Sequence, residues 1–179
     1  MPKTSFLLFL IATLSIGCSS SGISTYQNEV PPFRLEAFFN GKATGWGIVL
    51  NRNNRVIKRF KVEVEGIFSK DNLSGKLIEN FIWSDGKKEK RTWELKKLSD
   101  NKWNGKSDGV VGTAHGIIAG NALNWSYRYN ILIEDSFLKE LEVDFDDWMF
   151  LMEEDVLMNR AVFSKLGVRI GTVIITFKK

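Results

Sequence analysis

The chain has 179 residues, of which 25 are Lys or Arg and 21 are Asp or Glu, giving a formal net charge of +4. So small an excess argues against nucleic acid as a partner, because a nucleic-acid backbone is bound through many cationic contacts. The single cysteine excludes an intramolecular disulfide, and a chain of this length can fold without a disulfide, a metal or another cofactor.

The first predicted element is an apolar stretch at residues 6–16, which follows Lys3 and carries no charge. It is shorter than the roughly 20 residues that span a bilayer, but it suits the core of a signal peptide. A small residue precedes Cys18, as in bacterial lipoprotein cleavage sites, although Ser15 stands where Leu is commonest. We predict that residues 1–17 are removed and that Cys18 is lipidated. An ordinary secretory signal with an incidental cysteine is the alternative.

Lipidation would also explain a lone cysteine in an exported protein. Two or more acyl chains would hold the protein stably on its membrane. Ser19 stands where Asp commonly signals retention in the inner membrane, so we expect the outer membrane, with the protein facing the periplasm. Residues 18–32 are mainly small and polar and predict a flexible tether, which leaves residues 33–179 as the folded domain.

Beyond Pro32 the dominant hydrophobic period is two, which indicates half-buried strands. Asn40-Gly41 and Asp85-Gly86 indicate tight hairpins, because these residues tolerate a positive φ. The expected strands are 33–39, 42–50, 56–67, 77–83, 87–98, 102–106, 110–119, 121–133, 141–151, 156–166 and 168–177, with a turn at Asp135-Ser136. The segment 156–166 also suits a short helix that begins after Asp155, but we favour a strand.

Roughly nine to eleven strands joined by short turns predict an all-β domain, and an antiparallel up-and-down barrel is the simplest arrangement because it leaves no exposed edge. The 13 Phe and six Trp could either fill this barrel or line it. Small barrels of about eight strands can hold one small ligand. A membrane-spanning barrel is the alternative, and the charged faces opposite the apolar ones argue against it.

A series of short motifs runs through the predicted barrel. They are Phe39-Asn40-Gly41, Trp83-Ser84-Asp85-Gly86, Arg91-Thr92-Trp93, Gly112-Thr113-Ala114-His115-Gly116, Gly120-Asn121-Ala122-Leu123, Asp146-Asp147-Trp148-Met149 and Asn159-Arg160-Ala161. In their order they resemble a family of proteobacterial lipoproteins known only as domain of unknown function 3833. The resemblance implies an envelope lipoprotein with a lipocalin-like barrel, and an association with proteins that modify fatty acyl chains. It implies no activity and supplies no catalytic residues.

Asp147 is the most informative candidate residue, because alternation places its carboxylate on the apolar face of its strand, where an unpaired charge is costly. A turn centred on residues 154–155 would set Arg160 diagonally beside Asp147 on the same face. This arrangement predicts one of two roles. The two residues form either a buried ion pair that fixes the strand register or a polar anchor that orients a lipid headgroup or carboxylate.

The predicted ligand-binding residues are Trp83, Trp93, Trp125, Tyr127, Asp147 and Arg160. The aromatic members are plain core if the barrel is filled, and they line a cavity if it is hollow. Arg91 and Asn121 are further polar candidates. The sequence contains no motif of a known catalytic or metal site, and His115, the one histidine, has no carboxylate or nucleophile near it in the sequence.

We therefore expect a non-enzymatic, lipid-anchored barrel that binds or transfers a hydrophobic ligand, a fatty acid or lipid. The alternative is a structural or accessory envelope protein with a filled barrel and a protein partner. A lipid-modifying enzyme that uses Asp147, His115 or Arg160 is a third hypothesis. A packed interior would exclude the first hypothesis, and a cavity open to water with convergent polar groups would favour the third.

Overall fold

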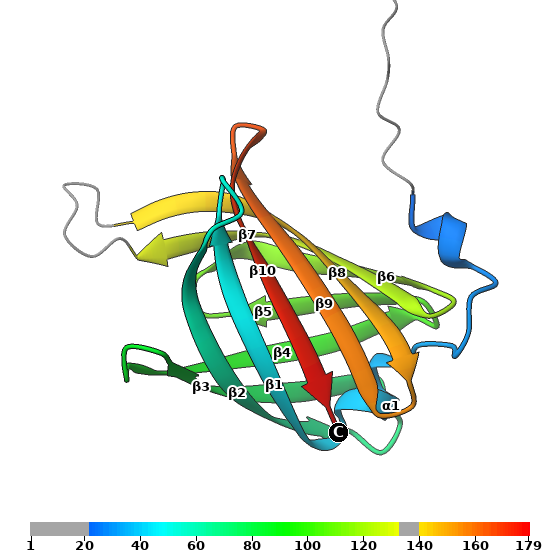
Figure 1. The fold of residues 1–179 in the computed structure, drawn as a ribbon. Coiled ribbons are helices and arrows are strands. Elements are labelled where there is room, and N and C mark those ends of the chain that lie inside the picture. Colours follow the sequence, from blue (N-terminus) through cyan, green and yellow to red (C-terminus); the bar gives the residue numbers. More distant parts are fainter. Residues whose placement is uncertain (1–21, 133–139) are drawn as a thin grey trace, which may run out of the picture.

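Ten antiparallel β-strands follow one another in the part of the chain that the computed structural model describes, residues 22–132 and 140–179 (Figure 1). They are β1 (Gly41–Asn51), β2 (Val56–Phe68), β3 (Ser74–Trp83), β4 (Lys88–Ser99), β5 (Lys102–Ser107), β6 (Val110–Ala119), β7 (Ala122–Leu132), β8 (Glu140–Glu153), β9 (Val156–Lys165) and β10 (Val168–Lys178). Each strand pairs with the next, and β1 also pairs with β10, so the sheet closes into a barrel. The predicted all-β, antiparallel up-and-down barrel is therefore confirmed, and the segment that also suited a helix is a strand, β9.

Side-chain alternation gives the barrel an apolar interior. In β2, Phe60, Val62 and Val64 are buried, whereas Glu63 and Glu65 are exposed. Successive residues of a strand point to opposite faces, so the hydrophobic period that predicts the strands also predicts which residues point inward.

A short helix, α1 (Leu35–Phe39), closes one end of the barrel, which we call the closed end (Figure 1). Leu35, Phe38 and Phe39 are all buried. The predicted strand 33–39 is therefore wrong. A strand would point the adjacent Phe38 and Phe39 to opposite faces, whereas a helix places residues three and four positions apart on one face and buries all three side chains.

The helix packs directly on β2 at Gly66. A Cβ at this position would lie 1.9 Å from the carbonyl oxygen of Phe39, so only glycine allows α1 to approach this closely. Glu36 of α1 is also buried, and its Oε1 lies 3.3 Å from Nζ of Lys97. This ion pair offsets part of the cost of burying the carboxylate and fixes the helix against β4.

Hairpins surround the opposite end, which we call the open end. Those within the described residues connect β1 to β2 through residues 52–55, β3 to β4 through residues 84–87, β5 to β6 through residues 108–109, and β9 to β10 through residues 166–167 (Figure 1). Gly86 has a φ of +86°, as the predicted Asp85-Gly86 turn requires. The predicted turn at Asp135-Ser136 lies outside the described residues.

The described part of the predicted tether, residues 22–32, lies against the barrel. It contains a 3-10 helix, η1 (Ile23–Tyr26), which contacts β6 and β7. The ring of Tyr26 lies edge-on to Trp148 and Phe150, with centroids 5.7 and 5.1 Å away. The predicted signal peptide and Cys18 lie outside the described residues, and no helix within them has the length and hydrophobicity needed to cross a membrane.

Candidate functional site

The barrel encloses a cavity of about 670 Å³. Its lining extends from Leu35 and Phe39 of α1, at the closed end, to Ile57 and Lys58 near the open end. A cavity of this size, with mainly apolar walls and a few polar groups, is typical of a small-molecule site. The interior is therefore hollow rather than filled by side chains.

Most of the predicted ligand-binding residues line this cavity. They are Trp83, Trp93, Trp125, Tyr127 and Asp147. The rings of Trp93 and Trp125 meet edge-on with centroids 5.9 Å apart, and Trp93 also contacts Tyr127 at 5.4 Å. Trp93 is on β4, and Trp125 and Tyr127 are on β7, so these rings are in contact across the intervening strands β5 and β6.

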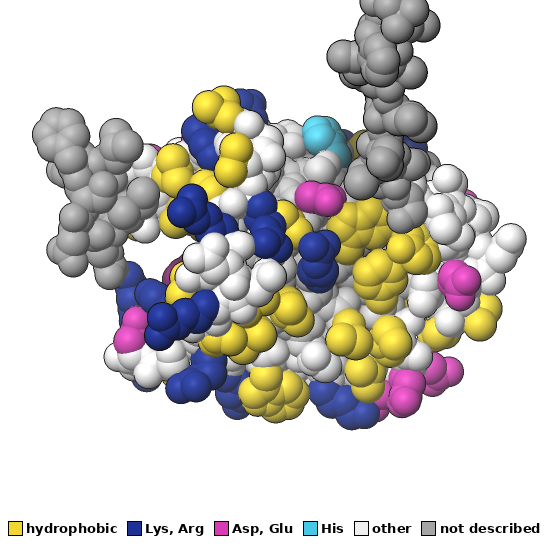
Figure 2. Space-filling model, turned by 45° about the horizontal axis from the view of Figure 1, so that its top comes forward, with side chains coloured by type: hydrophobic (Ala, Val, Ile, Leu, Met, Phe, Trp, Pro, Cys, Tyr) yellow, Lys and Arg dark blue, Asp and Glu magenta, His cyan; other side chains and the backbone are white. Residues whose placement is uncertain are grey.

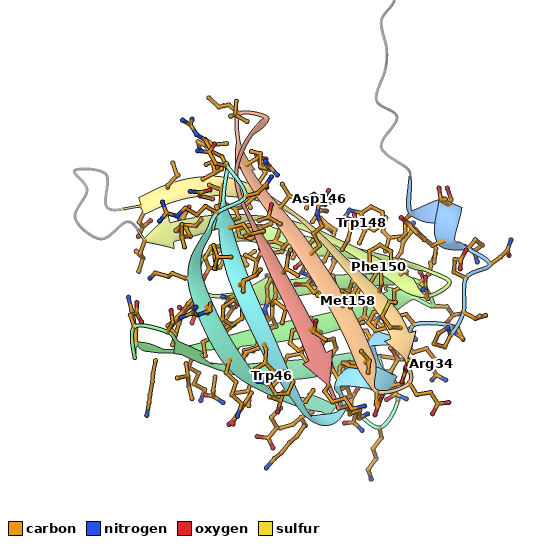
Figure 3. All side chains as sticks on the ribbon, in the orientation of Figure 1. Arg34, Trp46, Asp146, Trp148, Phe150 and Met158 are labelled. Carbon is orange, nitrogen blue, oxygen red and sulfur yellow. The ribbon has the colours of Figure 1, made fainter. Side chains whose placement is uncertain are left out.

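Arg160 is the exception among the predicted residues, because it is exposed on the outer face of β9. It is opposite Trp148, one of the outward residues of β8 labelled in Figure 3. The predicted contact between Arg160 and Asp147 is therefore wrong. A register irregularity between Leu151 and Glu153 shifts the pairing by one residue, so Asp147 is opposite Ala161.

Asn159 occupies the position beside Asp147 that was predicted for Arg160. Its Nδ2 donates a hydrogen bond to Asp147 Oδ1 and another, of 3.1 Å, to the carbonyl oxygen of Trp148. The sequence does contain a signal for this arrangement. Leu157, Ala161 and Phe163 are the buried apolar residues of β9, and they share the alternation of Asn159 rather than that of Arg160.

Burial raises the pKa of Asp147 to about 7. The hydrogen bond from Asn159 acts in the opposite direction, and the negative charge of Glu79 adds to the effect of burial. Burial likewise raises the pKa of Tyr127 well above its ordinary value, with the charge of Asp147 as the next cause. At neutral pH the carboxyl group of Asp147 is therefore present in both protonated and ionised forms.

A second polar group on the cavity wall consists of Glu79 on β3 and Arg91 on β4, which are opposite each other in the sheet. Arg91 Nε lies 3.7 Å from Glu79 Oε2, and Arg91 Nη2 lies 3.6 Å from Glu89 Oε1. The side chains of Glu79 and Arg91 are 15% and 23% exposed, and because both line the cavity we assign this accessible surface to the interior. Sequence reasoning missed Glu79 as a site residue, although it alternates in register with the inward Leu77 and Phe81.

Glu79 and Arg91 each have an atom without a hydrogen-bond partner within the described residues, namely Glu79 Oε2 and Arg91 Nε. Burial raises the pKa of Glu79, and Arg91 counteracts this only in part. Burial disfavours the charge of Arg91, but Glu79 and other nearby groups together hold its pKa above the ordinary value. The guanidinium also lies over the rings of Phe81, at 4.9 Å, and Tyr129, at 5.4 Å. The site thus presents a fixed cation to the cavity.

The remaining candidates lie away from the cavity. His115 is exposed on β6, and its Nδ1 lies 3.0 Å from Asn104 Oδ1. Asn121, at the β6–β7 turn, donates a hydrogen bond of 3.3 Å to the carbonyl oxygen of Leu151. Across residues 22–132 and 140–179 no group of three or more His, Cys, Asp or Glu side chains is placed to hold a metal ion. The polar residues of the cavity can bind and orient a molecule.

A closed up-and-down barrel around an apolar cavity with a few convergent polar groups defines a lipocalin-like protein. The chain belongs to the DUF3833 family, which is described as a protein of unknown function and matches residues 12–179. The family resemblance predicted from the sequence motifs is thus confirmed. No curated protein sequence matches the chain.

Two solved structures have a similar fold. The S-type phycobiliprotein lyase CPES from Guillardia theta has a TM-score of 0.55 and 10% sequence identity, over 82% of this chain and 93% of that chain. A protein of unknown function from the DUF3598 family of Nostoc punctiforme has a TM-score of 0.57 and 11% identity, over 84% of this chain and 51% of that chain. At these identities the similarity shows the fold alone.

Proposed function

We propose that this protein is a lipid-anchored carrier that binds one hydrophobic molecule, a fatty acid or lipid, inside its barrel. The observation that carries this proposal is the apolar cavity of about 670 Å³ with the Glu79–Arg91 ion pair in its wall, whose Arg91 Nε and Glu79 Oε2 atoms make no hydrogen bond within the described residues. A cavity lined by apolar and aromatic side chains favours an acyl chain, and a few placed polar groups fix its orientation. The similarity of the barrel to a phycobiliprotein lyase agrees with a ligand-binding role, although that likeness extends only to the fold.

The polar groups favour an amphiphile over a pure hydrocarbon. The guanidinium of Arg91 would attract a carboxylate or another acidic headgroup, since it has an unused donor in a low-dielectric wall. Asp147 in its protonated form would donate a hydrogen bond to the same headgroup or to an ester carbonyl.

Ala161→Phe should abolish most ligand binding while leaving the barrel intact. Ala161 is buried opposite Asp147 and lines the cavity, so a phenyl ring there would occupy ligand space. If the clash of the ring with the ligand costs about 1 to 3 kcal/mol of binding free energy, as overpacking typically does, the affinity falls by about 5- to 150-fold. Native mass spectrometry of the protein purified from the cell envelope measures the copurifying acyl species directly.

Val162→Phe is the matched control, because Val162 is the next residue of β9 and points to the outer face. It should retain the ligand of the wild type. A wild-type protein that carries no acyl species and takes up no added fatty acid would refute the carrier proposal. Equal ligand occupancy in wild type and Ala161→Phe would place the ligand outside the cavity.

The lipid anchor is part of the proposal and has its own test. We expect the N-terminal peptide of the envelope protein to begin at Cys18 and to carry the mass of attached acyl chains. Cys18→Ser should block this processing, because the acceptor thiol is gone, and leave residues 1–17 attached. An unmodified Cys18 in the wild-type peptide, measured by mass spectrometry, would contradict lipidation.

A further inference from the structure

Two neighbouring hairpins at the open end carry apolar side chains that the fold leaves in solvent. Val56 and Ile57 follow the β1–β2 turn and are 45% and 56% exposed, and Leu166 and Val168 of the β9–β10 turn are 89% and 65% exposed. Basic residues accompany them: Arg52, Arg55, Lys165 and Arg169. We call these eight residues the hairpin patch. Figure 2 shows yellow apolar side chains among dark blue basic ones on this part of the surface.

Leu166 has no role in the fold that explains its presence. Its φ is +52° and that of Gly167 is +77°, so the two residues form a turn with positive φ at both positions. Asn-Gly is the preferred pair in such a turn, and a bulky residue in the left-handed region is unfavourable. The side chain is almost fully exposed and gains no packing energy in return. A surface that buries Leu166 from outside would account for it.

Hydrogen bonds join the two hairpins of the patch into one surface. Arg169 Nη2 donates a hydrogen bond of 2.8 Å to the carbonyl oxygen of Arg52, and its Nη1 donates one of 3.2 Å to Asn54 Oδ1. Within the described residues, no ion pair involves Arg52, Arg55 or Lys165. Exposed cations around apolar side chains match an anionic lipid surface, which offers phosphates at the headgroups and acyl chains beneath them.

The patch is also continuous with the cavity, because Ile57 and the following Lys58 line it. The N-terminal end of the described chain is elsewhere: η1 contacts β6 and β7, and Phe33 N–H bonds to Gly120 at the β6–β7 turn of the closed end. A lipid anchor attached upstream of η1 therefore does not account for the patch. The surface that covers the hairpin patch therefore has to approach the protein from the open end.

We propose that the hairpin patch docks on an anionic phospholipid surface, with Leu166 and Val168 inserted among the acyl chains and the basic residues at the phosphates. This rests on the proposed lipid ligand, since docking would place the cavity entrance against the bilayer. An acyl chain could then pass between bilayer and barrel without crossing water, which removes the main barrier to transfer of a hydrophobic molecule.

Contact with the bilayer can be measured in the full chain with Leu166→Trp on vesicles that contain brominated phosphatidylglycerol. The bromine atoms quench tryptophan in contact with acyl chains, so the fluorescence added by the new residue should be quenched. Vesicles of brominated phosphatidylcholine alone should quench it less, because they lack the net negative charge. Leu73→Trp is the matched control: Leu73 is an exposed leucine at the β2–β3 turn of the closed end and should stay unquenched.

Leu166→Asn tests the role of docking in transfer. Asn suits the left-handed conformation, so the variant should fold at least as stably as the wild type. Loss of a leucine that docking would bury in the bilayer should slow uptake of fluorescent fatty acid from vesicles about tenfold without changing the amount bound at equilibrium. Absent quenching of Leu166→Trp, or equal quenching of Leu73→Trp, overturns the docking proposal. A protein that is quenched but takes up no fatty acid instead refutes the carrier function.

Discussion

Arg91→Met should lower the free energy of unfolding by about 3 to 5 kcal/mol at pH 8, because it leaves the buried Glu79 without its cation. Burial already raises the pKa of Glu79 in the wild type, and loss of Arg91 should raise it further. The folded variant would then bind a proton more tightly than the unfolded chain, so its stability falls as pH rises through the folded pKa. At pH 5 a larger fraction of Glu79 is protonated, and the deficit should be smaller. Urea unfolding at both pH values measures the effect.

Two further variants make this result specific. Replacing both Arg91 and Glu79 by Met substitutes apolar side chains for the pair and should recover most of the stability. Arg160→Met changes an arginine on the outer face and should shift the unfolding energy by less than about 0.5 kcal/mol. An unchanged unfolding energy in Arg91→Met at pH 8 would contradict the assignment of Arg91 as the counter-ion of Glu79.

The double variant also separates the two roles that a polar pair in a cavity wall can have. If the pair orients the headgroup of a ligand, the stable double variant should bind fatty acid more weakly than the wild type. If Glu79 and Arg91 only neutralise each other within the barrel wall, the affinity for fatty acid should be unchanged. The double variant allows this comparison because its apolar side chains should recover the stability without restoring either charge.

Local alternation was sufficient to predict the strands, the closed barrel and the inward position of five candidate residues. It could also have found the polar pair, because an antiparallel hairpin centred on residue 85 sets Glu79 opposite Arg91. The error at Arg160 has a different origin. A single irregularity in the β8–β9 pairing changes the register by one residue. The alternation of β9 indicates that Asn159 rather than Arg160 points inward, but it does not show which residue of β8 each one faces.

The helix α1 and the hollow interior could not be predicted from the sequence. Phe33, Leu35 and Phe39 fit a period of two as well as they fit a helix, and only burial of the adjacent Phe38 separates the two interpretations. Whether an apolar interior is filled or hollow depends on the circumference of the whole barrel, which is set by strand number and tilt. The atoms of Glu79 and Arg91 that lack a hydrogen bond can be identified only when these strands are assembled.

Asp147→Asn should make the protein more stable at pH 8, by about 2 to 4 kcal/mol. The carboxyl group has a pKa of about 7 in the folded protein against an ordinary value of 3.8, a difference equivalent to at most about 4 kcal/mol. The folded state therefore holds this proton more tightly than the unfolded chain does. Wild-type stability should fall as pH rises from about 4 to 7, and the loss is complete above that range. Asparagine cannot ionise, and its Oδ1 can still accept the hydrogen bond from Asn159.

The pH profile of the unfolding free energy between pH 4 and 8 is the measurement, and the variant should flatten it. Asp146→Asn is the matched control: Asp146 is the adjacent exposed carboxylate, and its charge raises the pKa of Asp147 less than burial does, so this variant should retain most of the wild-type slope. A wild-type slope that persists in Asp147→Asn would assign the titration to another group. Fatty-acid affinity measured on the same samples then decides the role of Asp147. If the protonated carboxyl anchors the headgroup, wild-type affinity should fall above pH 7, because the ionised form repels a carboxylate, and this fall should be absent in the variant.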